Sequence, residues 1–135
     1  MATVDDVDEL IERFHLVQGG VFKGNPETVK KLWEHGEDVS HANPYGPPAR
    51  GWDEVAKTIE HTSSLRRDGE FLGSEEIAKN VTPELAYVVA IERAKAKIGA
   101  SEEISPYALR ATNIFRLKDG EWKFVHRHAD PITTA

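Results

Sequence analysis

Residues 107–131 read YALRATNIFRLKDGEWKFVHRHADP, and they contain two runs rich in apolar, β-branched and aromatic residues. Lys118-Asp119-Gly120 separates the two runs. An Asp-Gly pair between such runs is a strong hairpin signal, because glycine tolerates the positive φ that a tight turn requires. The sequence therefore predicts an antiparallel β-hairpin over this stretch.

The residues upstream of the hairpin predict three helices and further strands. Apolar residues at helical spacing, with Gly, Asn and Pro at the boundaries, predict helices over residues 3–19, 25–36 and 51–69. Strand patterns cover residues 38–42, 71–80 and 86–98. Three helices followed by an antiparallel meander indicate a single α+β domain over residues 1–135, with helices covering one face of the sheet.

The composition excludes several classes of function. The formal net charge is -6 and the basic residues are scattered, which argues against nucleic-acid partners and against an anionic membrane surface. The chain has no cysteine, so disulfides, thiolate metal sites and cysteine nucleophiles are excluded. An acidic N-terminus and the lack of a run of about 20 apolar residues lead us to expect a cytoplasmic protein without a membrane span.

Several short motifs occur in a characteristic order. They are Gly24-Asn25-Pro26-Glu27, then Asn43-Pro44-Tyr45-Gly46 leading into Gly51-Trp52, and finally Asp119-Gly120-Glu121-Trp122 followed by His126-Arg127-His128. In this order they resemble the nuclear-transport-factor-2-like superfamily, and most of all its SnoaL-like group. The resemblance implies a cone-shaped, curved antiparallel half-barrel under three N-terminal helices. It also implies a pocket between sheet and helices and a homodimer formed through the outer sheet face.

The alternation of residues indicates which face of each hairpin strand is interior. In the first arm, the odd positions from Leu109 to Leu117 are mostly apolar and are expected to face inward. In the second arm, hydrophobicity favours an interior set with Trp122 and Phe124. The resemblance instead places the alternate set, with Arg127 and Ala129, inside near the mouth. Both interpretations of this last strand stay open.

The same superfamily contains ketosteroid isomerases, and the resemblance implies where their catalytic groups would lie. Their base is a carboxylate just before a Pro-x-Gly, and their oxyanion hole uses a Tyr and a protonated Asp. The corresponding positions here carry Asn43 and Asn113, while the first helix offers Phe14 and Val17 in place of the Tyr. Because Asn cannot accept the proton, we reject steroid isomerisation. Both amides are still candidates for orienting a ligand, and Asn43 also fits a turn.

Three residues are the catalytic candidates: Glu92, His126 and His128. Glu92 is interpreted either as an inward general base with a raised pKa, beside Arg110 or Arg127, or as an outward partner of an arginine. The two histidines are interpreted as acid/base groups, as interface residues, or as metal ligands together with His41. The predicted ligand-binding residues are Asn43, Tyr45, Trp52, Tyr87, Arg110, Asn113 and Arg127.

Together these features favour a pocket protein without a cofactor. We expect it to bind a small, mostly apolar organic ligand with a carbonyl or hydroxyl group, or to perform acid/base chemistry on it such as isomerisation, cyclisation or hydration. The first alternative is a non-catalytic homo-oligomerisation module, which a sealed or filled cavity would favour. The second is a His-x-His metalloenzyme. An open cavity with converging polar groups would favour the pocket protein.

Overall fold

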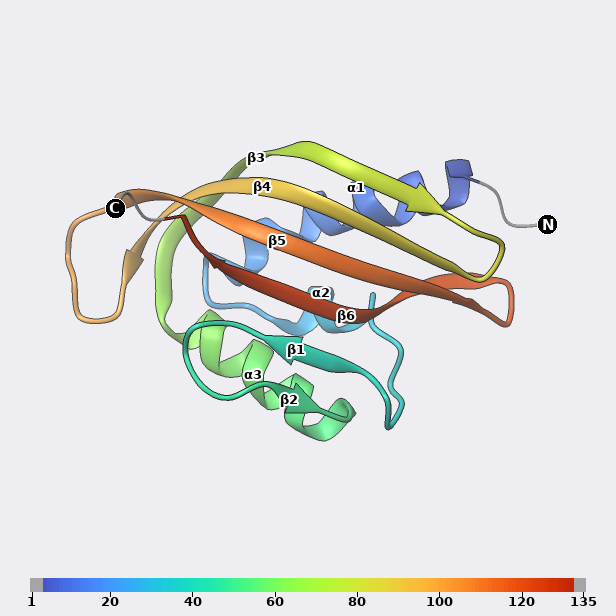
Figure 1. Ribbon diagram of the computed structural model, residues 1–135. Helices are drawn as coiled ribbons and strands as arrows, with labels where there is room; N and C mark the ends of the chain where they lie inside the picture. The colour runs from blue at the N-terminus through green and yellow to red at the C-terminus, as the bar shows by residue number, and fades with distance from the viewer. Residues whose placement is uncertain (1–3, 133–135) are drawn as a thin grey trace.

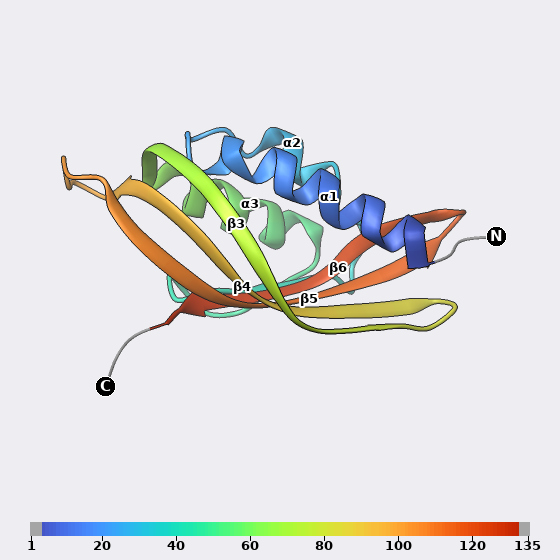
Figure 2. The same ribbon diagram turned by 90° about the horizontal axis from the view of Figure 1, so that it is seen from above.

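The computed structural model describes residues 4–132, and in this range three helices lie on one face of a six-stranded sheet (Figures 1 and 2). The helices are α1 (Val4–Val21), α2 (Glu27–Lys30) and α3 (Trp52–Ser64). The strands are β1 (Ser40–Ala42), β2 (Ala49–Arg50), β3 (Arg66–Val81), β4 (Leu85–Ile98), β5 (Ser105–Lys118) and β6 (Glu121–Pro131). The predicted α+β class with a curved sheet beneath the helices is confirmed.

The sheet has the order β2-β1-β6-β5-β4-β3, so β2 and β3 are its edges and the curved sheet stays open. β5 and β6 form the predicted hairpin, with positive φ at Asp119 (52°) and Gly120 (80°) in the turn. β1 pairs parallel to β6, which places His41 opposite Arg127. The first and last strands therefore lie side by side, as Figure 1 shows.

A β-bulge interrupts the hairpin near the middle of β6. Ile114 of β5 pairs with His126, whereas the next residue, Phe115, pairs with Phe124. Val125 is therefore an extra residue on β6 that has no partner on β5. An extra residue reverses the alternation of side chains, so that different positions face inward on its two sides.

This bulge reconciles the two interpretations of the last strand. Before it, Trp122 and Phe124 are buried in the core, as hydrophobicity predicts. Beyond it, Arg127 and Ala129 are buried, as the resemblance implies. On the first arm, the odd positions from Leu109 to Phe115 are buried as expected, whereas Leu117 is only partly buried.

The boundary between the third helix and the next strand differs from the prediction. The helix ends at Ser64, and Arg66 already belongs to β3. Asp68-Gly69 is not a helix stop, because it lies at a register shift within β3. The Gly69 amide donates to the Phe22 carbonyl at 2.9 Å, and a Cβ at position 69 would lie 2.6 Å from that oxygen. Glycine is required here because the strand passes directly against the end of α1.

The boundaries of the first two helices also differ from the prediction. α1 continues through Gly19-Gly20 to Val21, and its predicted start at Thr3 lies outside the described residues. α2 spans only four residues, because the chain after it turns to pair with β6: Phe124 donates to the Leu32 carbonyl at 2.9 Å. No helix within residues 4–132 has both the length and the apolar character needed to cross a membrane.

Candidate functional site

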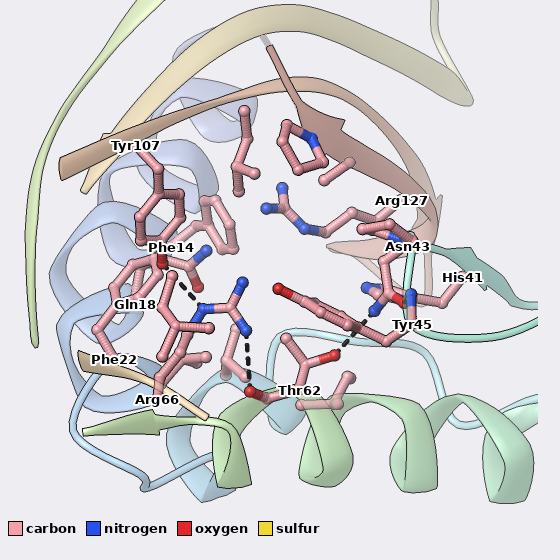
Figure 3. A pocket seen from close by; sticks show the side chains of 18 of the residues that line it. Phe14, Gln18, Phe22, His41, Asn43, Tyr45, Thr62, Arg66, Tyr107 and Arg127 are labelled. Carbon is pink, nitrogen blue, oxygen red and sulfur yellow. Dashed lines mark hydrogen bonds between the residues drawn. The ribbon is translucent and has the colours of Figure 1, made fainter. Parts of the chain in front are cut away.

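A cavity of about 270 Å³ lies between the helices and the inner face of the sheet (Figure 3). Most of its wall is apolar, and the lining residues include no aspartate or glutamate. Pro44, Tyr45 and Pro131 are the exposed members of the wall, so the cavity opens to solvent beside them. The polar members are Gln18, His41, Asn43, Tyr45, Thr62, Arg66, Tyr107 and Arg127.

Arg127 reaches the cavity from β6 because the bulge turns it inward. Its Nη1 donates to Glu92 Oε2 at 2.8 Å and to Asn113 Oδ1 at 3.0 Å, and its Nη2 donates to Glu92 Oε1 at 2.7 Å. Its Cζ lies 5.1 Å from the centroid of the Phe14 ring. Asn113 and Glu92 sit behind Arg127 and line a separate, smaller cavity of about 60 Å³. Arg127 therefore lines the large cavity, but its positive charge is already paired with Glu92.

Glu92 faces inward, but its electrostatics differ from the expected general base. The side chain is only 2% exposed, and burial alone would raise its pKa. The charge of Arg127 and its two hydrogen bonds outweigh burial, so the pKa of Glu92 lies below its ordinary value. Glu92 is therefore an ionised carboxylate whose two oxygens both accept hydrogen bonds from Arg127, and not the expected base with a raised pKa.

Arg66 contributes a second guanidinium at the start of β3. It is 4% exposed, its Nε donates to the Tyr107 hydroxyl at 2.8 Å, and its Nη1 donates to the Thr62 carbonyl at 2.9 Å. Burial raises the pKa of Tyr107, although the Arg66 charge opposes this, so the phenol keeps its proton at neutral pH. Figure 3 shows the ends of Arg66, Arg127 and Tyr45 pointing towards the centre of the cavity.

The loop after β1 supplies Asn43 and Tyr45. Asn43 Nδ2 donates to Thr62 Oγ1 on α3 at 2.8 Å, and Asn43 Oδ1 accepts from the Tyr45 amide at 3.0 Å. Asn43 therefore ties the loop to the helix and forms the turn that its position before a proline suggests. The Tyr45 ring lies 5.5 Å from the Arg66 guanidinium carbon.

His41 lies in the cavity wall on β1 and is 6% exposed. Its Nδ1 is buried without a hydrogen-bond partner among the described residues. Burial is the main cause that lowers the pKa of His41 to about 3, and the positive charge of Arg127 acts in the same direction. His41 is therefore neutral at physiological pH.

A family model for the SnoaL-like domain matches residues 7–133, nearly the whole chain. The chain belongs to the SnoaL-like domain family. A search of curated protein sequences gave no match.

Solved structures share the fold of this SnoaL-like chain at low sequence identity. A candidate dehydratase of the nuclear-transport-factor-2-like family from Streptomyces avermitilis is 22% identical, with 97% of this chain and 96% of that chain covered and a TM-score of 0.78. A ketosteroid isomerase-like protein from Erwinia carotovora atroseptica is 15% identical, with 97% of each chain covered and a TM-score of 0.79. A candidate calmodulin-dependent protein kinase II association domain from Thiobacillus denitrificans is 18% identical, with 93% and 94% covered and a TM-score of 0.74.

Besides Glu92 and Asn113, which line the smaller cavity, five further residues predicted to serve the site lie outside the wall of the large cavity. Tyr87 and Arg110 face the outer side of the sheet, where Tyr87 is 41% exposed and Arg110 pairs with Asp130. Trp52 begins α3 on the far side of Trp33, and stacks on His35 with ring centroids 3.9 Å apart. The other two are His126 and His128, which also face outward, beyond the bulge.

The three histidines considered as metal ligands do not converge. His41 faces the cavity, whereas His126 and His128 lie on the opposite face of the sheet. His126 Nδ1 lies 2.8 Å from Ser40 Oγ, and burial lowers its pKa. No group of three or more His, Cys, Asp or Glu side chains among the described residues is arranged to hold a metal ion. The alternative interpretation of His41 with the His-x-His pair as metal ligands is therefore contradicted by their geometry.

Sequence reasoning placed Asn43, Tyr45 and Arg127 at the pocket, where the structure has them, but it missed Arg66. The helical pattern over residues 51–69 includes Arg66, so the sequence predicts a helical residue there. The register shift at Asp68-Gly69 also interrupts the side-chain alternation of β3, which hides the inward orientation of Arg66. The cavity residues Gln18 and Thr62 lay within helical patterns that predict only an amphipathic face. Their contribution to a cavity carried no separate sequence signal.

Proposed function

We propose that this chain is a small-molecule pocket protein that binds a small, mostly apolar compound bearing a carbonyl or hydroxyl group. The observation that carries the proposal is the cavity itself, about 270 Å³ in volume, with apolar walls and a few converging polar groups. Such a combination is typical of ligand sites, and this volume lies just below their usual range of about 300–1,000 Å³, which suits a small ligand. Tyr45, Asn43 and Arg127 are the predicted ligand-binding residues in its wall.

The geometry favours binding over acid/base catalysis. Glu92 lies behind Arg127 with both oxygens occupied, and His41 has a pKa of about 3. Neither group is poised to exchange a proton near neutral pH. Asn43 stands where a ketosteroid isomerase-like site would need a carboxylate. If turnover occurs, the Tyr107 hydroxyl faces the cavity as a proton donor, because burial raises its pKa.

We also propose that two copies associate through the outer face of β4, β5 and β6, as the fold family implies. Figure 2 shows the three helices on the other face, so residues 4–132 leave this face uncovered. Thr112 lies at its centre, between Val89 and His128. His126 and His128 would then be interface residues. The cytoplasmic location expected from the sequence stays part of this proposal.

The pocket is tested by filling it. Ala129 is buried in the cavity wall, so Ala129→Phe occupies the space where a ligand would lie. Ala78→Phe makes the same change at an exposed position of β3 and is the matched control. Saturation-transfer difference NMR with 1-indanone and 2-naphthol, two small neutral probes, compares the proteins after circular dichroism has confirmed their folding. We expect binding by the unmodified protein and Ala78→Phe and its loss in Ala129→Phe. Equal binding by all three would refute the pocket as the site.

A further inference from the structure

Arg66 brings a buried positive charge to the cavity that no described carboxylate neutralises. Its side chain is 4% exposed, and its hydrogen bonds go to a tyrosine hydroxyl and a backbone carbonyl. No carboxylate among the described side chains forms an ion pair with it. A buried charge normally has such a partner, because removing an ion from water is costly. The partner of Arg66 is therefore to be sought in the cavity.

The guanidinium keeps donors free on the side that faces the cavity. Nε and Nη1 are engaged by Tyr107 and Thr62, but Nη2 has no acceptor among the described residues. Figure 3 shows a terminal nitrogen of Arg66 and the hydroxyl of Tyr45 directed into the same space. The free Nη2 group of an arginine and a phenol hydroxyl together form a donor pair that suits a carboxylate.

The aromatic rings around Arg66 hold it in this position. Its Cζ lies 5.5 Å from the ring centroids of both Tyr45 and Tyr107 and 5.8 Å from that of Phe22. These cation–π contacts keep the guanidinium at one place without cancelling its charge. The rings also exclude water from one side of the group, which strengthens its attraction for an anion.

The other ionisable groups in the wall leave the cavity with one net positive charge. Arg127 is neutralised by Glu92 through two hydrogen bonds. His41 is neutral, and the lining residues include no Asp or Glu. A single uncompensated charge matches a monoanion, whereas a phosphate ester with nearly two negative charges would leave one unbalanced.

Building on the function proposed above, we propose that the ligand is a small monocarboxylic acid with an apolar, aromatic or alicyclic body. Its carboxylate accepts from Arg66 Nη2 and from the Tyr45 hydroxyl, while its body fills the apolar part of the cavity. The formal net charge of the chain is -6, so a general attraction for anions does not account for such binding. The preference would come from Arg66 itself.

The test compares an acid with its uncharged analogue. Titration calorimetry at pH 7 measures the binding of trans-cinnamate and of trans-cinnamamide, which share one body and differ in charge. We expect the unmodified protein to bind the acid at least about tenfold more tightly, the magnitude typical of a charge-assisted hydrogen bond. Arg66→Met should abolish this preference, and Arg66→Lys, which keeps the charge without the fork, should retain part of it. Arg67→Met removes the neighbouring, partly exposed charge outside the cavity wall and should change nothing.

The outcomes separate this inference from the proposed function. If the acid and amide bind equally, or if Arg66→Met keeps the preference, the carboxylate inference is overturned while the pocket stands. If no neutral or acidic probe binds in a manner sensitive to Ala129→Phe, both fail. The comparison on the unmodified protein needs no variant to fold, so a misfolded Arg66→Met would not prevent a decision.

Discussion

Arg127 and Glu92 form a two-point ion pair in the interior, with N–O distances of 2.8 and 2.7 Å. They come from β6 and β4, two strands that are separated by β5 in the sheet. Asn113 on β5, between them, accepts a further hydrogen bond from the same guanidinium at 3.0 Å. The pair thus links three strands beneath the cavity floor and fixes the Arg127 side chain.

Replacing Glu92 with glutamine should destabilise the fold by about 3–5 kcal/mol, because it leaves the Arg127 charge buried and unpaired. Urea unfolding monitored by tryptophan fluorescence measures this loss. The double variant Glu92→Leu with Arg127→Met should recover most of the stability, since neither charge is then left alone. Glu75→Gln is the control: it breaks the exposed Arg93–Glu75 pair at 3.3 Å and should change the free energy by no more than about 0.5 kcal/mol. A small effect of Glu92→Gln would mean that water reaches Arg127.

His41 should make the protein lose stability in mild acid. Its pKa is about 3 in the fold against an ordinary value of 6.5, so below pH 6.5 the unfolded chain takes up a proton that the folded chain does not. The free energy of unfolding should therefore fall by up to about 1.4 kcal/mol per pH unit as the pH drops.

In the range from pH 6.5 to 4.5 His41 has the largest shift, and His15 and His126, whose pKa values burial also lowers, add to the slope in the same direction. The lowered pKa of Glu92 contributes stability that is lost only at lower pH, as the pH approaches the ordinary carboxyl value of 4.5 and falls through the folded-state value. Urea titrations across this range should show the slope reduced in His41→Phe and kept in His61→Gln, a change at an exposed histidine. The same slope in His41→Phe would show that another group is responsible.

Gly69→Ala should destabilise the protein by about 1–3 kcal/mol through overpacking. The new methyl group would lie 2.6 Å from the Phe22 carbonyl oxygen and 2.8 Å from the Ala96 Cβ, both within packed structure. Thermal unfolding followed by circular dichroism measures the change. Gly46→Ala, which meets nothing within 4 Å, is the matched control and should be close to neutral. Equal melting temperatures for both variants would contradict the close approach of β3 to α1.

Native mass spectrometry should find a dimer that depends on the outer sheet face. Thr112→Arg places a charge at the centre of that face, directly between the strands that flank β5, and should give a monomer. Ala100→Arg adds the same charge at an exposed position after β4 and should leave the dimer intact. A dimer that survives Thr112→Arg would assign the contact to another surface, and a monomeric unmodified protein would remove the proposed interface role of His126 and His128.

The sequence determined the α+β class, the hairpin at Asp119-Gly120 and the inner face of β5, because turn chemistry and side-chain alternation are local properties. It also pointed to Asn43, Tyr45 and Arg127. Tertiary structure decided what local patterns do not encode. The bulge at Val125 reverses the side-chain alternation partway along β6. Arg127 therefore faces inward, and His126 and His128 face outward.

The pairing of charges was likewise decided by the fold. Glu92 is 35 positions from Arg127 in the chain, and nothing near either residue specifies which carboxylate meets which guanidinium. Arg66 has the same dependence: it enters the cavity because β3 begins earlier than its helical pattern suggests and passes close to Phe22. Long-range strand pairing brings these groups together, and burial then sets their charge and hydrogen bonding, which is why the character of the cavity follows from packing and not from sequence pattern.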